Sequence, residues 1–153
     1  MRAVLDGFWS SYVQPILQRP GRVQMAALCY RTRNSGKQVL LITSRDTGRW
    51  IIPKGWPIDG KSSSETALQE AWEEAGVREG TAQTDAIGSY TYEKRFDDGS
   101  SEKVETTVYP VAVETLSDSF PEADERTRKW VSPDEAANLV DEPELKKLLE
   151  EFA

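Results

Sequence analysis

Hydrophobic and polar positions alternate along the chain with two different periods, and each period predicts a different kind of element. Apolar runs and two-residue alternation predict strands at residues 24–31, 38–44, 50–52, 86–95, 104–113 and 128–131. Apolar positions three and four residues apart, with capping signals, predict helices at residues 5–18, at 62–75, in a segment that opens at Ser132, and at 142–152. Strands interleaved with helices, two of them joined as a hairpin, predict a mixed α/β fold with helices on the faces of a mixed sheet.

The helix at residues 62–75 has the clearest local signals. Ser62 and Glu65 have the spacing of a capping box, and Gly76 is a typical helix stop. Its predicted apolar stripe repeats at positions i, i+3, i+4 and i+7 and consists of Leu68, Ala71, Trp72 and Ala75. We expect this face to pack against the sheet.

Three glutamates, Glu70, Glu73 and Glu74, lie on the other side of this helix within one turn of each other. They repel one another, and they lie toward the C-terminal end, where the helix dipole disfavours negative charge. A bound cation would remove both penalties, so the triplet is a candidate metal site. An ordinary glutamate-rich surface is the alternative. The Gly- and Pro-rich loop at residues 54–61 offers backbone carbonyls to complete an oxygen shell.

The composition narrows the chemistry. There is no histidine and a single cysteine, Cys29, which excludes Ser-His-Asp and Cys-His activation of a nucleophile and disfavours zinc. A metal here would be a hard cation on oxygen ligands, Mg²⁺ or Mn²⁺. Cys29 lies in an apolar run and is predicted to be a core residue.

Length and charge limit the class of protein. The 153 residues predict one domain, residues 1–153, in which residues 1–20 form an N-terminal helical extension. No apolar run approaches the roughly 20 residues of a membrane-spanning helix, and residues 1–20 lack the pattern of a signal peptide. We therefore expect a cytoplasmic protein without a membrane partner. A net charge of −7 and a pI of about 4.8 argue against binding to duplex nucleic acid.

Basic residues nevertheless recur at particular places in this acidic chain: Arg19, Arg22, Arg45, Arg49, Lys54, Arg126, Arg128 and Lys129. Cations placed locally on an acidic protein suit the capture of a small anion. For any one of them taken alone, a solvated surface position is the ordinary role.

Gly55 and the segment Glu70-Ala-Trp-Glu-Glu-Ala-Gly-Val77 resemble the Nudix box, Gly-x5-Glu-x7-Arg-Glu-U-x-Glu-Glu-x-Gly-U, in which U is apolar. The spacing is preserved without a gap over all 23 residues. Two positions depart from the pattern, because Lys61 stands where the family has glutamate and Gln69 where it has arginine. In the family these two brace the loop against the helix as an ion pair. Here Lys61 is left to pair with Glu65 or to meet a substrate phosphate.

The resemblance extends beyond the box. Ser44-Arg45, the segment Arg49-Trp-Ile-Ile-Pro-Lys-Gly55 and the segment Glu125-Arg-Thr-Arg-Lys-Trp130 resemble the diphosphoinositol polyphosphate phosphohydrolase subgroup. Together the similar segments cover most of residues 22–140. The resemblance implies an α/β/α sandwich with a mixed central sheet, and a metal-dependent hydrolase that acts on acid anhydrides in phosphorus-containing compounds.

Carried over residue by residue, the family pattern implies Glu70 and Glu74 as the main metal ligands. It implies Glu73 as a further ligand or as a group that acts on the water, and the backbone carbonyl of Lys54 as an additional ligand. The substrate-binding residues that it implies are Arg22, Ser44, Arg45, Lys54, Arg126 and Arg128.

Several alternatives stay open in the sequence. The general base is not chosen among Glu102, Glu105 and Asp98, and Trp50 and Trp56 either stack on a base or pack, with packing favoured for Trp50. The expected substrate is a small phosphorylated molecule, either a diphosphoinositol polyphosphate or a dinucleoside polyphosphate. The alternatives are a nucleoside-triphosphate or nucleotide-sugar pyrophosphohydrolase and a non-catalytic, nucleotide-binding sensor. The sequence does not determine the oligomeric state.

Overall fold

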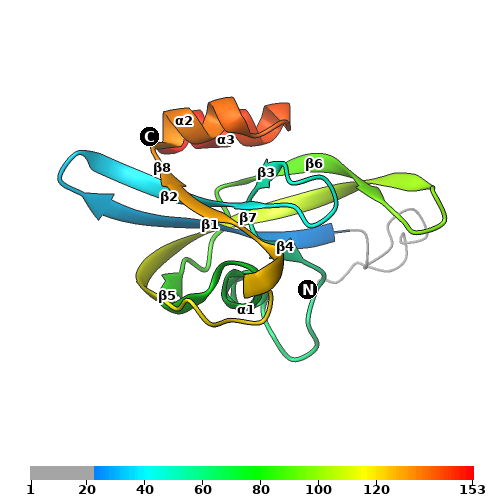
Figure 1. The fold of residues 1–153 in the computed structure, drawn as a ribbon, viewed down its shortest axis with the longest axis horizontal. Coiled ribbons are helices and arrows are strands. Elements are labelled where there is room, and N and C mark those ends of the chain that lie inside the picture. Colours follow the sequence, from blue (N-terminus) through cyan, green and yellow to red (C-terminus); the bar gives the residue numbers. More distant parts are fainter. Residues whose placement is uncertain (1–22) are drawn as a thin grey trace.

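The computed structural model describes residues 23–153, which form one sheet flanked by helices (Figure 1). In this part of the chain the sheet has eight strands: β1 (Val23–Arg33), β2 (Gly36–Thr43), β3 (Trp50–Ile51), β4 (Lys54–Gly55), β5 (Val77–Ala82), β6 (Gly88–Arg95), β7 (Ser101–Leu116) and β8 (Arg128–Val131). The helices are α1 (Ser63–Ala75), α2 (Pro133–Leu139), α3 (Pro143–Phe152) and the short 3-10 helix η3 (Ala123–Glu125).

The sheet is mixed, as the sequence predicts. Its central path runs β3-β2-β1-β7-β5, with β4 paired to β1, β6 to β7 and β8 to β2. Strands β1 and β7 run parallel, with Val23 opposite Glu105 and Tyr30 opposite Ala112. The other pairs are antiparallel.

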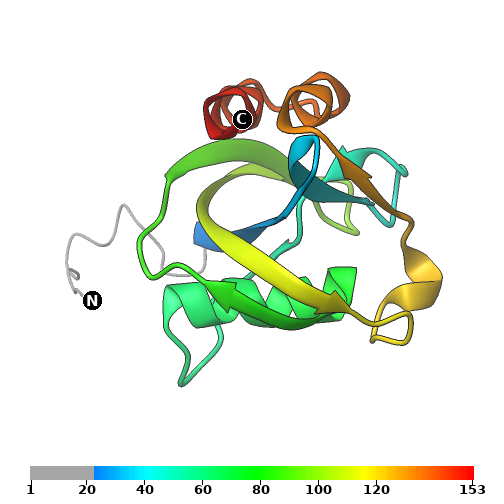
Figure 2. The ribbon, with the colours of Figure 1, turned by 90° about the vertical axis from the view of Figure 1, so that its left-hand side faces the viewer.

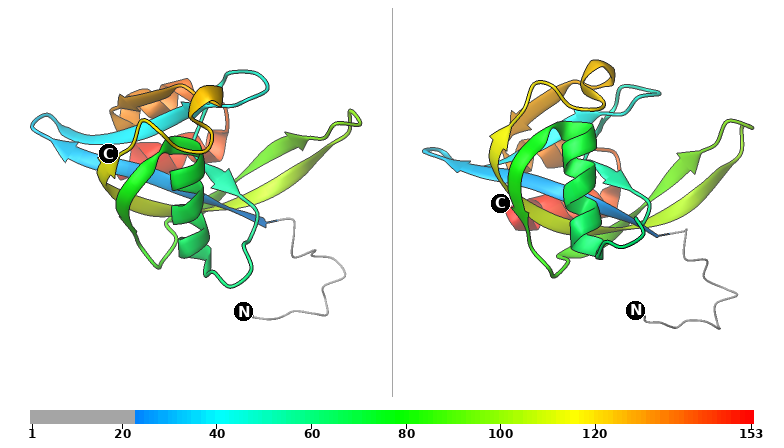
Figure 3. Two further views of the ribbon diagram at one scale, coloured as in Figure 1. Left: turned by 60° about the horizontal axis from the view of Figure 1, so that its bottom comes forward. Right: turned by 90° about the horizontal axis from the view of Figure 1, so that it is seen from below.

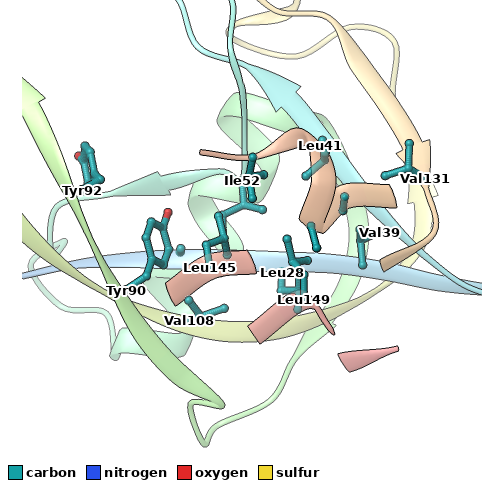
Figure 4. Close-up of a cluster of buried hydrophobic side chains, with 14 of the residues drawn as sticks. Leu28, Val39, Leu41, Ile52, Tyr90, Tyr92, Val108, Val131, Leu145 and Leu149 are labelled. Carbon is teal, nitrogen blue, oxygen red and sulfur yellow. The ribbon is translucent and has the colours of Figure 1, made fainter. Parts of the chain in front are cut away.

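Both faces of the sheet are buried, and strand alternation explains why. Along β1, Ala26 and Leu28 point into the core shared with α2 and α3, whereas Ala27 and Cys29 point into the core shared with α1. Figure 4 shows the first of these clusters around Leu28, and Figures 1 and 2 show the helices on opposite faces. The expected α/β/α sandwich is confirmed, and so is the core position of Cys29, which is 0% exposed.

The capping signals of α1 are confirmed and its predicted apolar stripe is partly wrong. Ser62 and Glu65 form both bonds of the capping box, and Gly76 ends the helix in the left-handed conformation. The row that packs flat on the sheet is Ala67, Ala71 and Ala75, whereas the larger Leu68 and Trp72 lie half-buried on one flank. Small side chains occupy this face because a helix that lies close to a sheet leaves little room beneath it.

The hairpin predicted from residues 86–113 is confirmed as β6 and β7, although β7 is longer than its apolar core. The strands β4 and β5 were not expected, because one is only two residues long and the other, Val-Arg-Glu-Gly-Thr-Ala, has little apolar alternation. The predicted helix at residues 5–18 lies outside the described residues. None of the described helices has the length and apolarity needed to cross a membrane.

Candidate active site

Helix α1 lies beside strand β4 (Figure 3), and two of its three glutamates contact that strand. Glu70 and Glu74 are one turn apart and therefore share a flank of the helix, beside the buried row of alanines. This flank faces Lys54 and Gly55 of β4. The sequence alone suggested a solvated flank, but both carboxylates are partly withdrawn from water.

Gly55 is required by space. Its backbone passes directly against the Glu70 carboxyl group, and a Cβ at this position would overlap the carboxyl carbon and both oxygens. Any other residue would push Glu70 away from β4. The first glycine of the motif therefore positions the first of its glutamates.

Glu74 is held from two sides. Its Oε1 accepts a hydrogen bond from the Lys54 backbone N–H at 3.2 Å, and its Oε2 lies 3.5 Å from Nη2 of Arg126. Arg126 is itself 5% exposed, and it also donates to Glu122 at 2.7 and 2.9 Å and to the Thr43 carbonyl at 2.9 Å. The position of Glu74 is thus determined by the sheet and not by its own helix alone.

The two carboxylates disfavour being ionised together. Burial, and after it the charges of Glu74 and Glu73, raise the pKa of Glu70 to about 8. Burial also raises the pKa of Glu74, while Arg126 and Lys54 oppose that shift. Without a cation the pair therefore keeps a proton at neutral pH. A divalent cation would replace this proton, and the set of oxygen donors suits Mg²⁺ or Mn²⁺.

A cavity of about 790 Å³ opens beside Glu74. It has basic residues from four separate segments in its lining: Arg45, Arg49, Lys54, Lys94, Arg95 and Arg126. Acidic residues also line it, Asp46, Glu93, Asp97 and Asp141 in addition to Glu74. The excess of positive side chains beside a carboxylate pair suits an anionic ligand that also contacts a metal ion.

The predicted phosphate-binding residues have different fates in the structure. Ser44 and Arg45 line the cavity, and Arg45 is exposed and pairs with Glu125 at 3.2 Å. Arg128 is not in the lining, because its guanidinium donates to the carbonyls of Ala75 and Ser117 and pairs with Asp118. These bonds fasten the C-terminal end of α1. Arg22 lies outside the described residues.

Lys54 contributes a side chain as well as a backbone to the site. Its Nζ lies 4.5 Å from the centroid of the Tyr92 ring, and the Tyr92 hydroxyl donates to Gln24 at 2.5 Å. Burial lowers the pKa of Lys54 to about 8, against the opposing effect of Glu74. A partly desolvated cation at this position attracts phosphate more strongly than one in bulk water.

The NUDIX domain family matches residues 22–152. The chain belongs to this family. Nudix hydrolase 21, chloroplastic, of Arabidopsis thaliana is 34% identical over 131 residues, which cover 80% of this chain and 61% of that protein. Diphosphoinositol polyphosphate phosphohydrolase 3-beta of Homo sapiens is 26% identical over 117 residues, which cover 75% of this chain and 66% of that protein. The chain thus spans about three fifths to two thirds of the length of these relatives.

The fold is also that of solved Nudix structures. The crystal structure of the C. elegans Ap4A hydrolase superposes with a TM-score of 0.60 at 21% identity, over 86% of this chain and 96% of that one. The MutT protein of Methanosarcina mazei Go1 superposes with a TM-score of 0.61 at 23% identity, over 88% and 94% of the two chains. At these identities the likeness concerns the fold alone.

The two departures from the Nudix box change the surroundings of Glu73. Gln69 donates its side-chain N–H to Glu73 at 2.7 Å, which directs this carboxylate along α1. Within residues 23–153 no three metal-ligating side chains converge into one cluster. Glu70 and Glu74 therefore come together, and Glu73 does not join them.

Lys61 does not pair with Glu65, the first of its two expected partners. The Glu65 carboxylate accepts the Ser62 backbone N–H at 2.8 Å, and Lys61 forms no ion pair with any residue between 23 and 153. It lines a second cavity of about 500 Å³ on the outer flank of α1, together with Gln69 and Trp72. This cavity is separate from the one beside Glu74.

The sequence left candidates open for the general base and for stacking on a base, and none of these residues lines the cavity beside Glu74. Asp98 is bonded to Ser100 in the hairpin turn, and Glu105 accepts from Ser89 at 3.4 Å. Neither they nor Glu102 belong to the lining. Trp50 and Trp56 pack against the core cluster under α2 and α3, which agrees with the packing favoured for Trp50.

The sequence did not single out two of the cavity residues, Lys94 and Arg95, and it named a third, Arg49, only among the recurring basic residues. Arg49 pairs with Glu142 at 2.6 Å and joins β3 to the start of α3. Lys94 and Arg95 form a basic pair at the end of β6. The pair is visible in the sequence, but only the structure shows that it lines the same cavity as Glu74.

Proposed function

We propose that the protein hydrolyses a phosphoanhydride bond in a small, multiply phosphorylated molecule, with Mg²⁺ or Mn²⁺ held by Glu70 and Glu74. The observation that carries this proposal is the pair of carboxylates beside β4: Glu70 lies against Gly55, and Glu74 lines a cavity that also has six arginine and lysine side chains in its lining. Membership of the Nudix family and relatives named as hydrolases support it.

The residues of the chain have distinct roles in this reaction. Glu70 and Glu74 would hold the metal ion together with the backbone carbonyl of Lys54, and Glu73, which is bonded to Gln69, would act on the attacking water. Bound there, the metal ion neutralises the anhydride and favours attack by water. Arg126 and the Lys54 amide keep Glu74 in place. Ser44, Arg45 and the Lys54 ammonium bind the phosphates.

The substrate class is inferred from charge. Six basic residues line the cavity, and two of them, Lys94 and Arg95, have no carboxylate partner among residues 23–153, which favours a substrate with phosphates beyond a single diphosphate. A diphosphoinositol polyphosphate or a dinucleoside polyphosphate meets this requirement, and relatives named for each class of substrate agree with it. A nucleoside triphosphate or a nucleotide sugar is the second candidate, since it offers fewer phosphate groups to the same cations.

A substrate panel tests the proposal. The protein is incubated with Mg²⁺ or Mn²⁺ and each of four substrates: a diphosphoinositol polyphosphate, a dinucleoside polyphosphate, a nucleoside triphosphate and a nucleotide sugar. Phosphate-containing products are measured beside Glu74→Gln and beside Glu150→Gln, a control on the exposed side of α3. We expect turnover that Glu74→Gln loses and Glu150→Gln keeps. Equal turnover by Glu74→Gln would overturn the metal-hydrolase proposal, and nucleotide binding without any turnover would instead support a sensor.

Two further expectations stay predictions. The single-domain organisation over residues 1–153 and the cytoplasmic location rest on the sequence pattern alone. Relatives include proteins named chloroplastic and mitochondrial, so the compartment is best measured directly, by imaging a tagged protein in its own cell.

A further inference from the structure

The far end of the β6–β7 hairpin stands apart from the rest of the sheet. Among residues 23–153, the last residue of β7 that pairs with β1 is Glu105, opposite Val23, the first described residue. Beyond it, β7 pairs with no described strand except β6, out to Arg95 opposite Ser101. We call residues 92–104 the hairpin arm, which projects from the body in Figures 1 and 3. A two-stranded ribbon of this kind has little support of its own.

The hairpin arm carries the uncommitted cations of the cavity. Arg45, Arg49 and Arg126 each have a carboxylate partner, and the Lys54 ammonium lies over the Tyr92 ring. Lys94 and Arg95 form no ion pair and no side-chain hydrogen bond with any residue from 23 to 153. Binding an anion therefore breaks no existing bond at these two positions, whereas it competes with a carboxylate at the three arginines.

The strand pleat directs Lys94 toward the cavity. Along β6, Tyr90 and Tyr92 are buried while Thr91 and Glu93 are exposed, so Lys94 shares the inward face of the two tyrosines. It lies two residues beyond Tyr92, about 7 Å further along the strand. From Glu74 outward, the cavity wall thus presents Lys54, then the Tyr92 ring, then Lys94.

We propose that Lys94, assisted by Arg95, determines specificity by binding a phosphate that lies beyond the bond to be cleaved. This inference rests on the proposed function and adds to it the element that selects the substrate. Because Lys94 lies beyond Lys54 and the Tyr92 ring, we expect it to contact a chain of three phosphates and not a single phosphate group near Glu74. The hairpin arm therefore favours compounds with additional phosphates over simple diphosphates.

The test measures binding without catalysis. Calorimetry in EDTA compares the affinity for inorganic tripolyphosphate and for orthophosphate in the wild type, Lys94→Ala and Lys103→Ala. Lys103 is the matched control, because it lies in the same hairpin opposite Glu93, is exposed and is not in the cavity lining. We expect Lys94→Ala to weaken tripolyphosphate binding about tenfold, as for loss of one charge-assisted contact. Orthophosphate binding should change by less than about twofold, and Lys103→Ala should bind both ligands like the wild type.

Equal tripolyphosphate affinity in Lys94→Ala and the wild type would overturn the proposal. An equal loss of tripolyphosphate affinity in Lys94→Ala and Lys103→Ala would also overturn it, since the loss would then follow from the change in net charge and not from the position of Lys94. Lys94→Arg should restore binding. The binding measurement does not depend on turnover. If the protein hydrolyses none of the panel substrates, the proposed function is refuted, but the calorimetry still tests whether Lys94 binds phosphate. If turnover is found, Lys94→Ala should raise KM for the most phosphorylated substrate and leave kcat unchanged.

Discussion

The two walls of the cavity are built in opposite ways. On the side formed by α1 and β4, the two carboxylates are fixed by their surroundings: Glu70 lies against Gly55, and Glu74 is held by the Lys54 amide and by Arg126. On the wall formed by the hairpin arm, Lys94 and Arg95 have no ionic partner, and the two strands of the arm pair only with each other, as far as residues 23–153 are concerned.

This contrast separates two requirements on an enzyme site. Groups that hold a metal ion need a geometry that does not relax, which packing and neighbouring hydrogen bonds supply. Groups that select among substrates need free charge at a variable position, which a projecting hairpin supplies. The following predictions test the contrast, in order of expected effect.

Gly55→Ala should have the largest effect on the rigid wall. The added Cβ overlaps the Glu70 carboxyl group, so Glu70 must leave its position and kcat should fall by roughly 10²- to 10³-fold. Gly60→Ala in the same loop is the control, because nothing lies within 4 Å of its Cβ although its φ is +82°. It should lower stability by about 1–2 kcal/mol and keep activity. Comparable activity in the two variants would show that the contact at Gly55 does not position Glu70.

Arg126→Ala should destabilise the fold by about 3 kcal/mol, because it leaves Glu74 and Glu122 without their buried cation. Arg45→Ala removes an exposed arginine from the same cavity and should cost less than about 1 kcal/mol. Urea unfolding measures both. A similar loss of unfolding free energy in the two variants would contradict the claim that Arg126 is part of the rigid wall while Arg45 is not.

The metal-free protein should lose stability as the pH rises. The pKa of Glu70 is about 8 in the folded state against an ordinary 4.5, so between these values the folded state binds more protons than the unfolded state. The contribution of Glu70 is therefore favourable at low pH and is lost as the pH rises toward 8. In EDTA, Glu70→Gln should melt above the wild type at pH 8 and close to it at pH 5. Added Mg²⁺ should raise the Tm of the wild type more than that of the variant.

Thiol labelling compares the two regions in one molecule. Cys29 is fully buried beneath α1, and burial raises the pKa of its thiol to about 12, so native protein should not react with a thiol reagent at pH 8. In Phe96→Cys, the new thiol at the exposed tip of the hairpin arm should react at the rate of a free thiol while Cys29 stays unmodified. Labelling of Cys29 in native protein would show that the α1 wall opens.

The sequence was informative where short-range rules decide the outcome. The capping box at Ser62, the stop at Gly76 and the core position of Cys29 follow from local spacing and polarity, and the structure has each of them. Strand β5 was missed because its polar sequence becomes a strand only when β7 offers an edge to pair with. The predicted apolar stripe of α1 was misplaced because the prediction followed the large apolar residues Leu68 and Trp72. The face that packs on the sheet instead carries small alanines, which fit in the narrow space beneath the helix.

The candidate site divides along the same line. Glu70, Glu74 and Gly55 are recognisable as a set because their spacing along the chain follows from one loop and one helix. The sequence implied Arg128 and not Lys94 as a substrate-binding residue, whereas in the structure Lys94 lines the cavity and Arg128 does not. No local feature of the sequence indicates either outcome. Arg128 donates its hydrogen bonds to carbonyl groups at the C-terminal end of α1 and just beyond β7. Lys94 reaches the cavity because β6 pairs with β7, which pairs with β1.

By itself the sequence determined the family, the carboxylate pair and the oxygen-only donor set, since these depend on residue identity at close spacing in a chain without histidine. The tertiary structure alone decided which cations surround the pair and which of them are already neutralised. Segments as distant as β1 and β7 must first pair before Lys94 and Glu74 share a cavity. Electrostatic partners act over a few ångströms of space, and long-range strand pairing, not sequence distance, sets that space.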